Sequence, residues 1–253
     1  MEQWIFLRGL TRGAGHWGAF VAEFSAQHPQ ARVLALDMPG NGALYAQRSP
    51  ASVAALAQAC RAQWLASGGT GPVRLLAMSL GAMVALEWAR QYPQEVQALV
   101  LINTSLRRFS PFYARLRPAN YAALLRLLCW PCSDPTIERE ILRMTSRHAQ
   151  YPVLLDWVLL RKRQPVAPAN ALRQLWAAWR YQSAAQAPGL PVLVLGGQGD
   201  QLVSVQCSLA LAQHWGCDLR LHPSAGHDLP LDDGPWVAAQ VRRWTRERAL
   251  PEL

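Results

Sequence analysis

The 253-residue sequence has few charged residues, a single lysine and fewer acidic than basic side chains. Charged residues make up 16% of the chain and hydrophobic residues 51%, so there is enough apolar surface for a folded core, which excludes a disordered protein. Lys162 is the one lysine among 25 basic residues, and 16 acidic residues leave a formal net charge of +9. An excess of this size favours an acidic partner, whether nucleic acid, membrane surface or protein.

Cysteine is also scarce. The five cysteines are an odd number without regular spacing, which is typical of a reducing compartment rather than of a disulfide scaffold. Cys129 and Cys132 have the C-x-x-C spacing of redox and zinc sites, and their role stays open. A zinc site needs two further ligands, and the isolated His148 is the sole candidate nearby. We therefore expect no metal and no cofactor.

Long apolar runs are missing. The run at 96–102 spans seven residues, far below the roughly 20 that a membrane-spanning helix needs. The first eight residues lack the basic stretch, long apolar run and cleavage site of a signal peptide. We expect a cytoplasmic protein without a membrane span.

Short apolar runs rich in β-branched residues alternate with longer helical patterns. The alternation predicts an α/β fold, with a mostly parallel sheet and helices on both faces. The expected strands cover 3–8, 32–37, 73–78, 97–103, 192–196 and 218–222. The expected helices between them cover 17–28, 51–66, 80–91, 204–215 and 234–248.

One long segment interrupts this alternation. Residues 104–190 show helical patterns and eight prolines but no strand pattern. We therefore expect an α/β core formed by 1–103 and 191–253, with a helical cap at 104–190 inserted between late strands. The cap holds thirteen basic residues and four acidic ones, so its formal charge of +9 equals that of the whole chain.

The segment Ala77-Met78-Ser79-Leu80-Gly81 joins an expected strand directly to an expected helix. It matches the G-x-S-x-G nucleophile elbow with Ala in the first small position, where a sharp turn exposes the serine hydroxyl above the sheet. The helix N-terminus favours negative charge, so the Leu80 N–H is a natural oxyanion donor. The alternative is that Ser79 only caps the helix.

An acid and a histidine follow two later strands. Asp200 lies on a glycine-rich turn after the strand at 192–196, and His227 lies on the loop after the strand at 218–222. Parallel α/β sheets carry their sites at these carboxyl ends, and the chain order Ser, Asp, His suits a hydrolase triad. Other candidates are expected to be surface or locally bonded residues; they are Asp228, Asp232, Asp233, His222 and His16.

With these motifs the chain resembles the α/β-hydrolase family over nearly its whole length. The turn 36–42, with Asp37, Pro39, Gly40 and Gly42, looks like the family's D-x-P-G-x-G. The family often has His-Gly-x after its first strand, and this chain has Arg8-Gly9-Leu10 there. The resemblance implies that the Leu10 N–H is the second oxyanion donor, although Arg8 departs from the pattern.

Within the family, the size, elbow and cap most resemble the cytoplasmic pimeloyl-[acyl-carrier-protein] methyl ester carboxylesterases of biotin synthesis. The resemblance implies a serine carboxylesterase that forms an acyl-enzyme, with Ser79, Asp200 and His227 as catalytic residues. A nucleophilic serine argues against a haloalkane dehalogenase, whose elbow carries Asp. Thioesterase, lactonase and C–C hydrolase activities stay open, as does a ligand receptor without catalysis.

The charge of the cap suggests a partner. We expect the arginines of the cap, Arg139, Arg143 and Arg147 among them, to steer an acidic acyl carrier protein with its ester toward the site. An arginine-rich genome that solvates helix faces is the competing explanation. No helix-turn-helix, zinc finger or RNA-binding motif accompanies the charge, so we expect no nucleic-acid partner. We expect a monomer.

Overall fold

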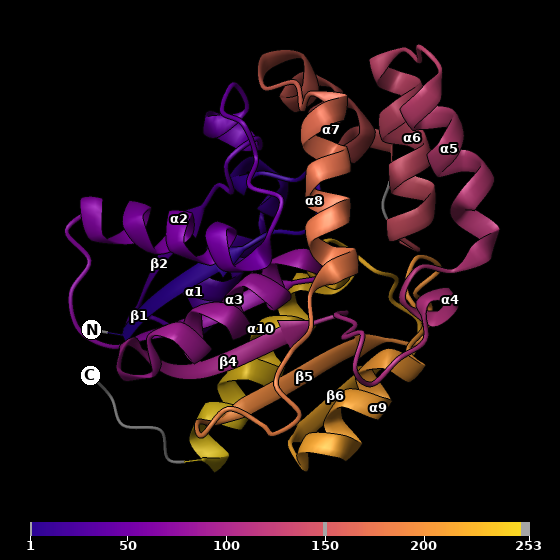
Figure 1. The fold of residues 1–253 in the computed structure, drawn as a ribbon. Helices are drawn as coiled ribbons and strands as arrows, with labels where there is room; N and C mark the ends of the chain where they lie inside the picture. The colour runs from indigo at the N-terminus through magenta and orange to yellow at the C-terminus, as the bar shows by residue number, and fades with distance from the viewer. Residues whose placement is uncertain (1, 149–150, 249–253) are drawn as a thin grey trace.

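Six parallel strands form the centre of the molecule. The structure, a computed structural model, describes residues 2–148 and 151–248 (Figure 1). The strands are β1 (Glu2–Leu7), β2 (Ala31–Leu36), β3 (Val73–Met78), β4 (Val96–Ile102), β5 (Val192–Gly197) and β6 (Asp218–His222). They form one sheet in the order β2-β1-β3-β4-β5-β6, and every neighbouring pair is parallel. The predicted α/β fold is confirmed, and the sheet is wholly rather than mostly parallel.

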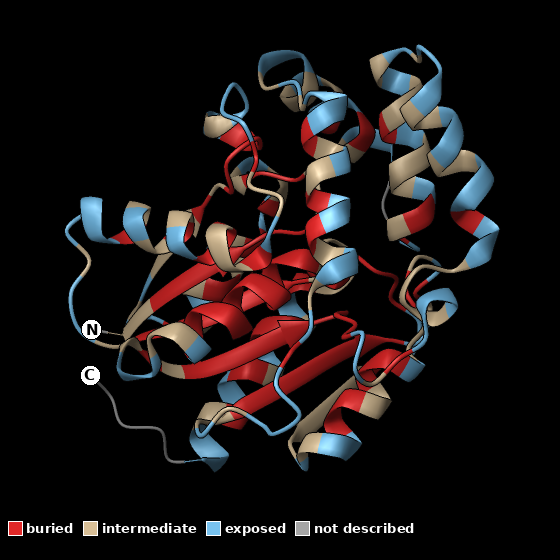
Figure 2. Ribbon diagram, in the orientation of Figure 1, coloured by how far each residue is buried: buried red, intermediate tan, exposed pale blue. Residues whose placement is uncertain are grey.

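Helices cover both faces of the sheet, as predicted. Strand β1 shows why, because its buried residues alternate between two clusters. Ile5 and Leu7 pack into a cluster with α2 (Val53–Ala66), α3 (Leu80–Gln91) and α9 (Gln206–Trp215). Trp4 and Phe6 pack into the other cluster with α1 (Phe20–Gln27) and α10 (Leu229–Glu247). The central strands are consequently buried on both faces (Figure 2).

Some predicted helix bounds differ from the structure. Helix α10 begins five residues before the predicted 234, because two helical segments join at Asp233, whose backbone is not helical. The Asp233 carboxylate accepts the Trp236 N–H at 3.0 Å, so a helix segment does start at Gly234-Pro235. Short 3-10 helices lie at Ala14–Trp17, Gly42–Leu44, Pro93–Glu95 and Pro118–Asn120. No helix of the described residues is long and apolar enough for a membrane crossing.

The cap residues form helices between β4 and β5, grouped beside the carboxyl ends of the strands (Figure 1). They are α4 (Phe112–Arg115), α5 (Tyr121–Cys129), α6 (Asp134–Thr145), α7 (Tyr151–Arg163) and α8 (Pro168–Arg180).

A buried ion cluster fastens two cap helices to the loop after β1. Glu138 of α6 is fully buried and lies 2.7 Å from Arg12 of that loop and 2.5 Å from Arg161 of α7. The Arg12 guanidinium stacks over the ring of Trp157, 4.2 Å from its centroid. These contacts join the cap to the loop that carries Leu10.

Candidate active site

Ser79 is the only residue between β3 and α3. Its backbone has φ 55° and ψ −118°, a strained conformation for a residue with a side chain. Two hydrogen bonds hold the turn, since the Ser79 N–H donates to the Ile102 carbonyl at 2.9 Å and the Thr104 hydroxyl donates to the Ser79 carbonyl at 3.1 Å. Ser79 remains partly exposed, as a nucleophile needs to be.

The elbow needs small residues because β1 passes close to it. A Cβ at Gly81 would lie 2.4 Å from the Arg8 carbonyl oxygen and 2.5 Å from that of Leu7. A Cβ at Gly9 would lie 3.2 Å from the Ser79 Cβ. The glycines therefore allow the loop after β1 to lie directly against the serine, where an oxyanion donor is required.

Asp200 and His227 come together as the sequence predicted. His227 Nδ1 lies 2.7 Å from Asp200 Oδ2, and both side chains are buried. The other Asp200 oxygen accepts the N–H groups of Leu202 at 2.8 Å and Val203 at 2.9 Å, which fixes the carboxylate. A proton on Nδ1 that is shared with Asp200 leaves Nε2 as the nitrogen that can take a proton from a serine.

Asn103, which the sequence analysis did not identify, supports the histidine loop from the end of β4. Its side-chain amide donates to the carbonyls of His227 at 2.8 Å and Gly226 at 3.0 Å, and its oxygen accepts the Gly197 N–H at 2.9 Å. Asn103 has φ 45°, a conformation that Asn tolerates better than most residues. The Ser79 N–H donates to the carbonyl of Ile102, the residue before Asn103. The end of β4 therefore holds both the serine turn and the histidine loop.

The two predicted oxyanion donors come from the two segments that adjoin the serine, the start of α3 and the loop after β1. Leu80 is the first residue of α3, and Leu10 lies on the loop after β1. Within 2–148 and 151–248, neither N–H has a hydrogen-bond acceptor. The next residue, Thr11, has φ 59° and donates its N–H to Gln174 of α8 at 2.9 Å. The cap therefore contacts the oxyanion loop directly.

The rival candidates have other partners. The His222 ring accepts the Ala225 N–H at 2.8 Å and lies 3.2 Å from Asp233. Asp232 accepts N–H groups from Gly226 and from Arg147 and His148, which follow α6. The expectation that Asp228 is a surface residue is wrong, because it is 1% exposed and bonds to Arg8.

His16 is a half-buried residue beside the ion cluster. Its Nε2 lies 3.0 Å from Arg12 Nη1, and its ring meets that of Trp157 edge to face. Burial first, and then the charge of Arg12, lower the pKa of His16 well below its ordinary value. The imidazole is consequently neutral at neutral pH and accepts a hydrogen bond from Arg12.

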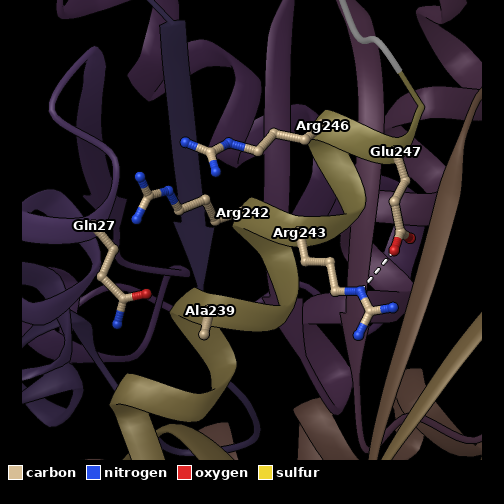
Figure 3. Close-up of a pocket in the computed structure, with 6 residues that line it drawn as sticks. All are labelled: Gln27, Ala239, Arg242, Arg243, Arg246 and Glu247. Carbon is tan, nitrogen blue, oxygen red and sulfur yellow. Dashed lines mark hydrogen bonds and ion pairs between the residues drawn. The ribbon is translucent and has the colours of Figure 1, made fainter.

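Other potential sites carry no comparable chemistry. Cys129 and Cys132 are free thiols, and no His, Cys, Asp and Glu grouping in the described part of the chain could hold a metal ion. A cavity of about 360 Å³ lies between α1 and α10, and Ser79 is not among its lining residues (Figure 3). It is lined by Gln27, Ala239, Arg242, Arg243, Arg246 and Glu247. Arg243 bonds to Glu247 at 2.6 Å, so part of this basic lining is neutralised.

Comparison with known proteins supplies the family context. The model of the Alpha/beta hydrolase family matches residues 4–240. The Putative carbamate hydrolase RutD of Cronobacter sakazakii is 29% identical over 226 residues, which are 82% of this chain and 76% of that protein.

Solved structures share the fold. A thermophilic esterase from Thermogutta terrifontis has a TM-score of 0.77 at 21% identity, covering 98% of this chain and 90% of its own. The carboxylesterase CesB of Bacillus subtilis has a TM-score of 0.74 at 19% identity, covering 95% and 82%. At these identities, the likeness establishes the architecture alone.

Proposed function

The chain belongs to the alpha/beta hydrolase family, and on that premise we propose that it hydrolyses carboxylic esters through an acyl-enzyme on Ser79. The proposal is supported by two observations, the buried Asp200–His227 contact of 2.7 Å and the strained, partly exposed backbone turn at Ser79. Structural residues rarely need a strained elbow and an oriented imidazole together.

The residues divide the reaction into two steps. In the first, Ser79 Oγ attacks the ester carbonyl carbon while His227 Nε2 takes its proton. The C–O bond to the alcohol then breaks, His227 returns the proton to the leaving alkoxide, and the acyl group remains on Ser79. In the second step, water attacks the acyl carbon, His227 passes the water's proton to Ser79 Oγ, and the carboxylic acid leaves.

The remaining groups stabilise charge. Asp200 orients His227 and stabilises the imidazolium that forms in each step. The N–H groups of Leu10 and Leu80 donate to the oxyanion, and one such donor typically contributes about 3 kcal/mol to the transition state.

The more specific part of the proposal concerns which class of bond is hydrolysed. Esters suit a serine nucleophile with two oxyanion donors, and the resemblance to carboxylesterases favours them. The same groups would also cleave thioesters, lactones or the carbamates named for the relative RutD. We place the methyl ester of pimeloyl-[acyl-carrier-protein] first among substrates, because the cap combines a net positive charge with arginines that a carrier can reach.

Labelling with a fluorophosphonate probe tests the serine hydrolase proposal. We expect the probe to label the wild type and not to label Ser79→Ala. Ser204→Ala, a control on another loop, should be labelled like the wild type. Equal labelling of wild type and Ser79→Ala would contradict the proposal. A panel of p-nitrophenyl esters, acyl thioesters, lactones and carbamates then identifies the bond.

A charge reversal tests the carrier. Arg139, Arg143 and Arg147 on the cap are exposed, and their change to Glu should raise KM for a carrier-bound ester but not for a free one. The matched control changes the charge equally on α10 (Figure 3), at Arg242, Arg243 and Arg246. Equal effects of both triple variants would refute docking on the cap.

A further inference from the structure

Arg8 and Asp228 form an ion pair in the interior of the molecule. Arg8 Nη1 donates to Asp228 Oδ1 at 2.9 Å, and Nη2 donates to Oδ2. The two side chains are 1% and 2% exposed, so the pair is almost completely shielded from water. Two parallel hydrogen bonds from one guanidinium fix both the distance and the angle between the partners.

The pair connects two loops that take part in the proposed reaction. Arg8 directly follows β1 and lies two residues before Leu10, the proposed oxyanion donor. Asp228 directly follows His227, the proposed base. The residues are 220 positions apart in the chain, so no local structure relates these loops.

We propose that the Arg8–Asp228 pair is a positioning pair, which sets His227 and the Leu10 N–H in register around Ser79. The inference rests on the proposed function, since it concerns the same serine, histidine and oxyanion donor.

Arg8 and Asp228 each have a further contact that fixes their position. The Arg8 guanidinium lies over the ring of Trp17, 4.8 Å from its centroid. The Asp228 N–H donates to the Thr145 carbonyl at the end of α6, at 2.6 Å. Because both partners are held in this way, the pair keeps the two loops at a fixed relative position. Such rigidity matters because a shift of about 1 Å at the reacting groups can slow a reaction strongly.

Stability alone is a poor reason for this pair. A buried ion pair typically contributes no more stability than well-packed apolar residues of similar volume. The two parallel hydrogen bonds instead fix the geometry between two loops whose relative position affects the proposed reaction rate. Arg8 also occupies the position where the related enzymes often carry His, so this chain has its own means of holding the oxyanion loop.

Another ion pair with a buried arginine provides a matched control. Arg74 of β3 lies 2.5 Å from Glu2 at the opposite end of β1, and the Arg74 side chain is fully buried. Arg74 resembles Arg8 in residue type and burial, and its partner Glu2 begins the strand that Arg8 follows, at the end away from Ser79.

Steady-state kinetics on a p-nitrophenyl ester test the proposal, with active sites counted by the burst of nitrophenol. We expect Arg8→Met to lower kcat per active site by roughly 10- to 100-fold and to change KM less than about threefold. Arg8→Lys keeps the charge without the two parallel hydrogen bonds and should recover only part of the loss. Arg74→Met should lower the melting temperature but leave kcat per active site unchanged.

The pH profile separates positioning from mere loss of structure. The charged groups bonded to this region are Arg8, Asp228, Asp200, Arg117 and Asp232. Arg8→Met leaves the Asp228 charge unbalanced, which favours the imidazolium, so the acid limb of kcat/KM should move to higher pH. Asp228→Asn leaves the Arg8 charge unbalanced and should move that limb to lower pH, each by the order of half a pH unit or more.

Two results would overturn the pairing. One is wild-type kcat per active site in Arg8→Met, and the other is movement of the acid limb in the same direction in both variants. If Arg8→Met does not fold, wild-type kcat per active site in Arg8→Lys, or an acid limb that does not move to lower pH in Asp228→Asn, would overturn the proposal instead. Turnover that survives Ser79→Ala would instead refute the proposed function itself, so the two failures are distinguishable.

Discussion

Glu138 offers the sharpest test of how the cap is attached. Its carboxylate is fully buried and contacts two guanidinium groups, Arg12 at 2.7 Å and Arg161 at 2.5 Å. Burial already lowers the pKa of Arg12, and Glu138 opposes that shift. Glu138→Gln removes the negative charge and leaves two buried cations facing a neutral amide.

The expected cost follows from this burial. Removing one partner of a buried ion pair costs about 3–5 kcal/mol, whereas an exposed pair contributes about 0–1 kcal/mol. Glu140 supplies the contrast on the same helix, because it also pairs with two arginines but its side chain is 22% exposed. We therefore expect Glu138→Gln to lower the free energy of unfolding by about 3–5 kcal/mol, and Glu140→Gln by less than about 1 kcal/mol.

Urea unfolding followed by tryptophan fluorescence measures both variants, and a thermal scan provides a second estimate. For a chain of this size, the Glu138→Gln loss corresponds to a fall in melting temperature of about 10 °C. Equal losses for Glu138→Gln and Glu140→Gln would refute the argument, because burial would then not control the effect.

Three further predictions concern the site and its surroundings. Gly81→Ala should lower kcat by at least about 10-fold, because the new methyl would lie 2.4 Å from a carbonyl oxygen after β1; kinetics that match the wild type would contradict this. Gln174→Leu removes the acceptor of the Thr11 N–H and should also lower kcat by about 10-fold, while Asn170→Leu, one turn earlier on α8, should not. His16 is neutral in the fold, so the unfolded chain binds its proton first as the pH falls, and stability should decrease below about pH 6.5 by up to about 1.4 kcal/mol per pH unit. Urea midpoints between pH 7.5 and 5.5 check this, and the same slope in His16→Gln would disprove the assignment.

The sheet and the main site residues could be predicted because each left a local signal. The strands are short apolar runs, and Ser79 stands between a strand and a helix with small residues two positions before and after it. Asp200 and His227 follow strands that end at the same edge of a parallel sheet. In each case neighbouring residues alone define the element. The parallel sheet then brings the carboxyl ends of the strands, and the residues that follow them, to one edge.

The supporting contacts could not be predicted, because they join distant segments. Nothing around Arg8 points to Asp228, and nothing around Glu138 points to Arg12. Asn103 left one weak signal, an amide side chain directly after a buried strand. Asp228 was expected at the surface because a charged residue between a histidine and a helix is usually solvated; the structure buries it because Arg8 lies opposite.

The point at which the cap leaves the core has an evolutionary consequence. Strands β4 and β5 are hydrogen-bonded neighbours, with Leu99 paired to Val192, although 89 residues separate the two strands. A shorter, longer or unrelated insertion can therefore replace the cap without changing the order of the strands. Ser79, Asp200 and His227 all lie outside it, so a new insertion would keep these three residues but would have to replace the contacts that Gln174 and Thr145 make with the loops beside them.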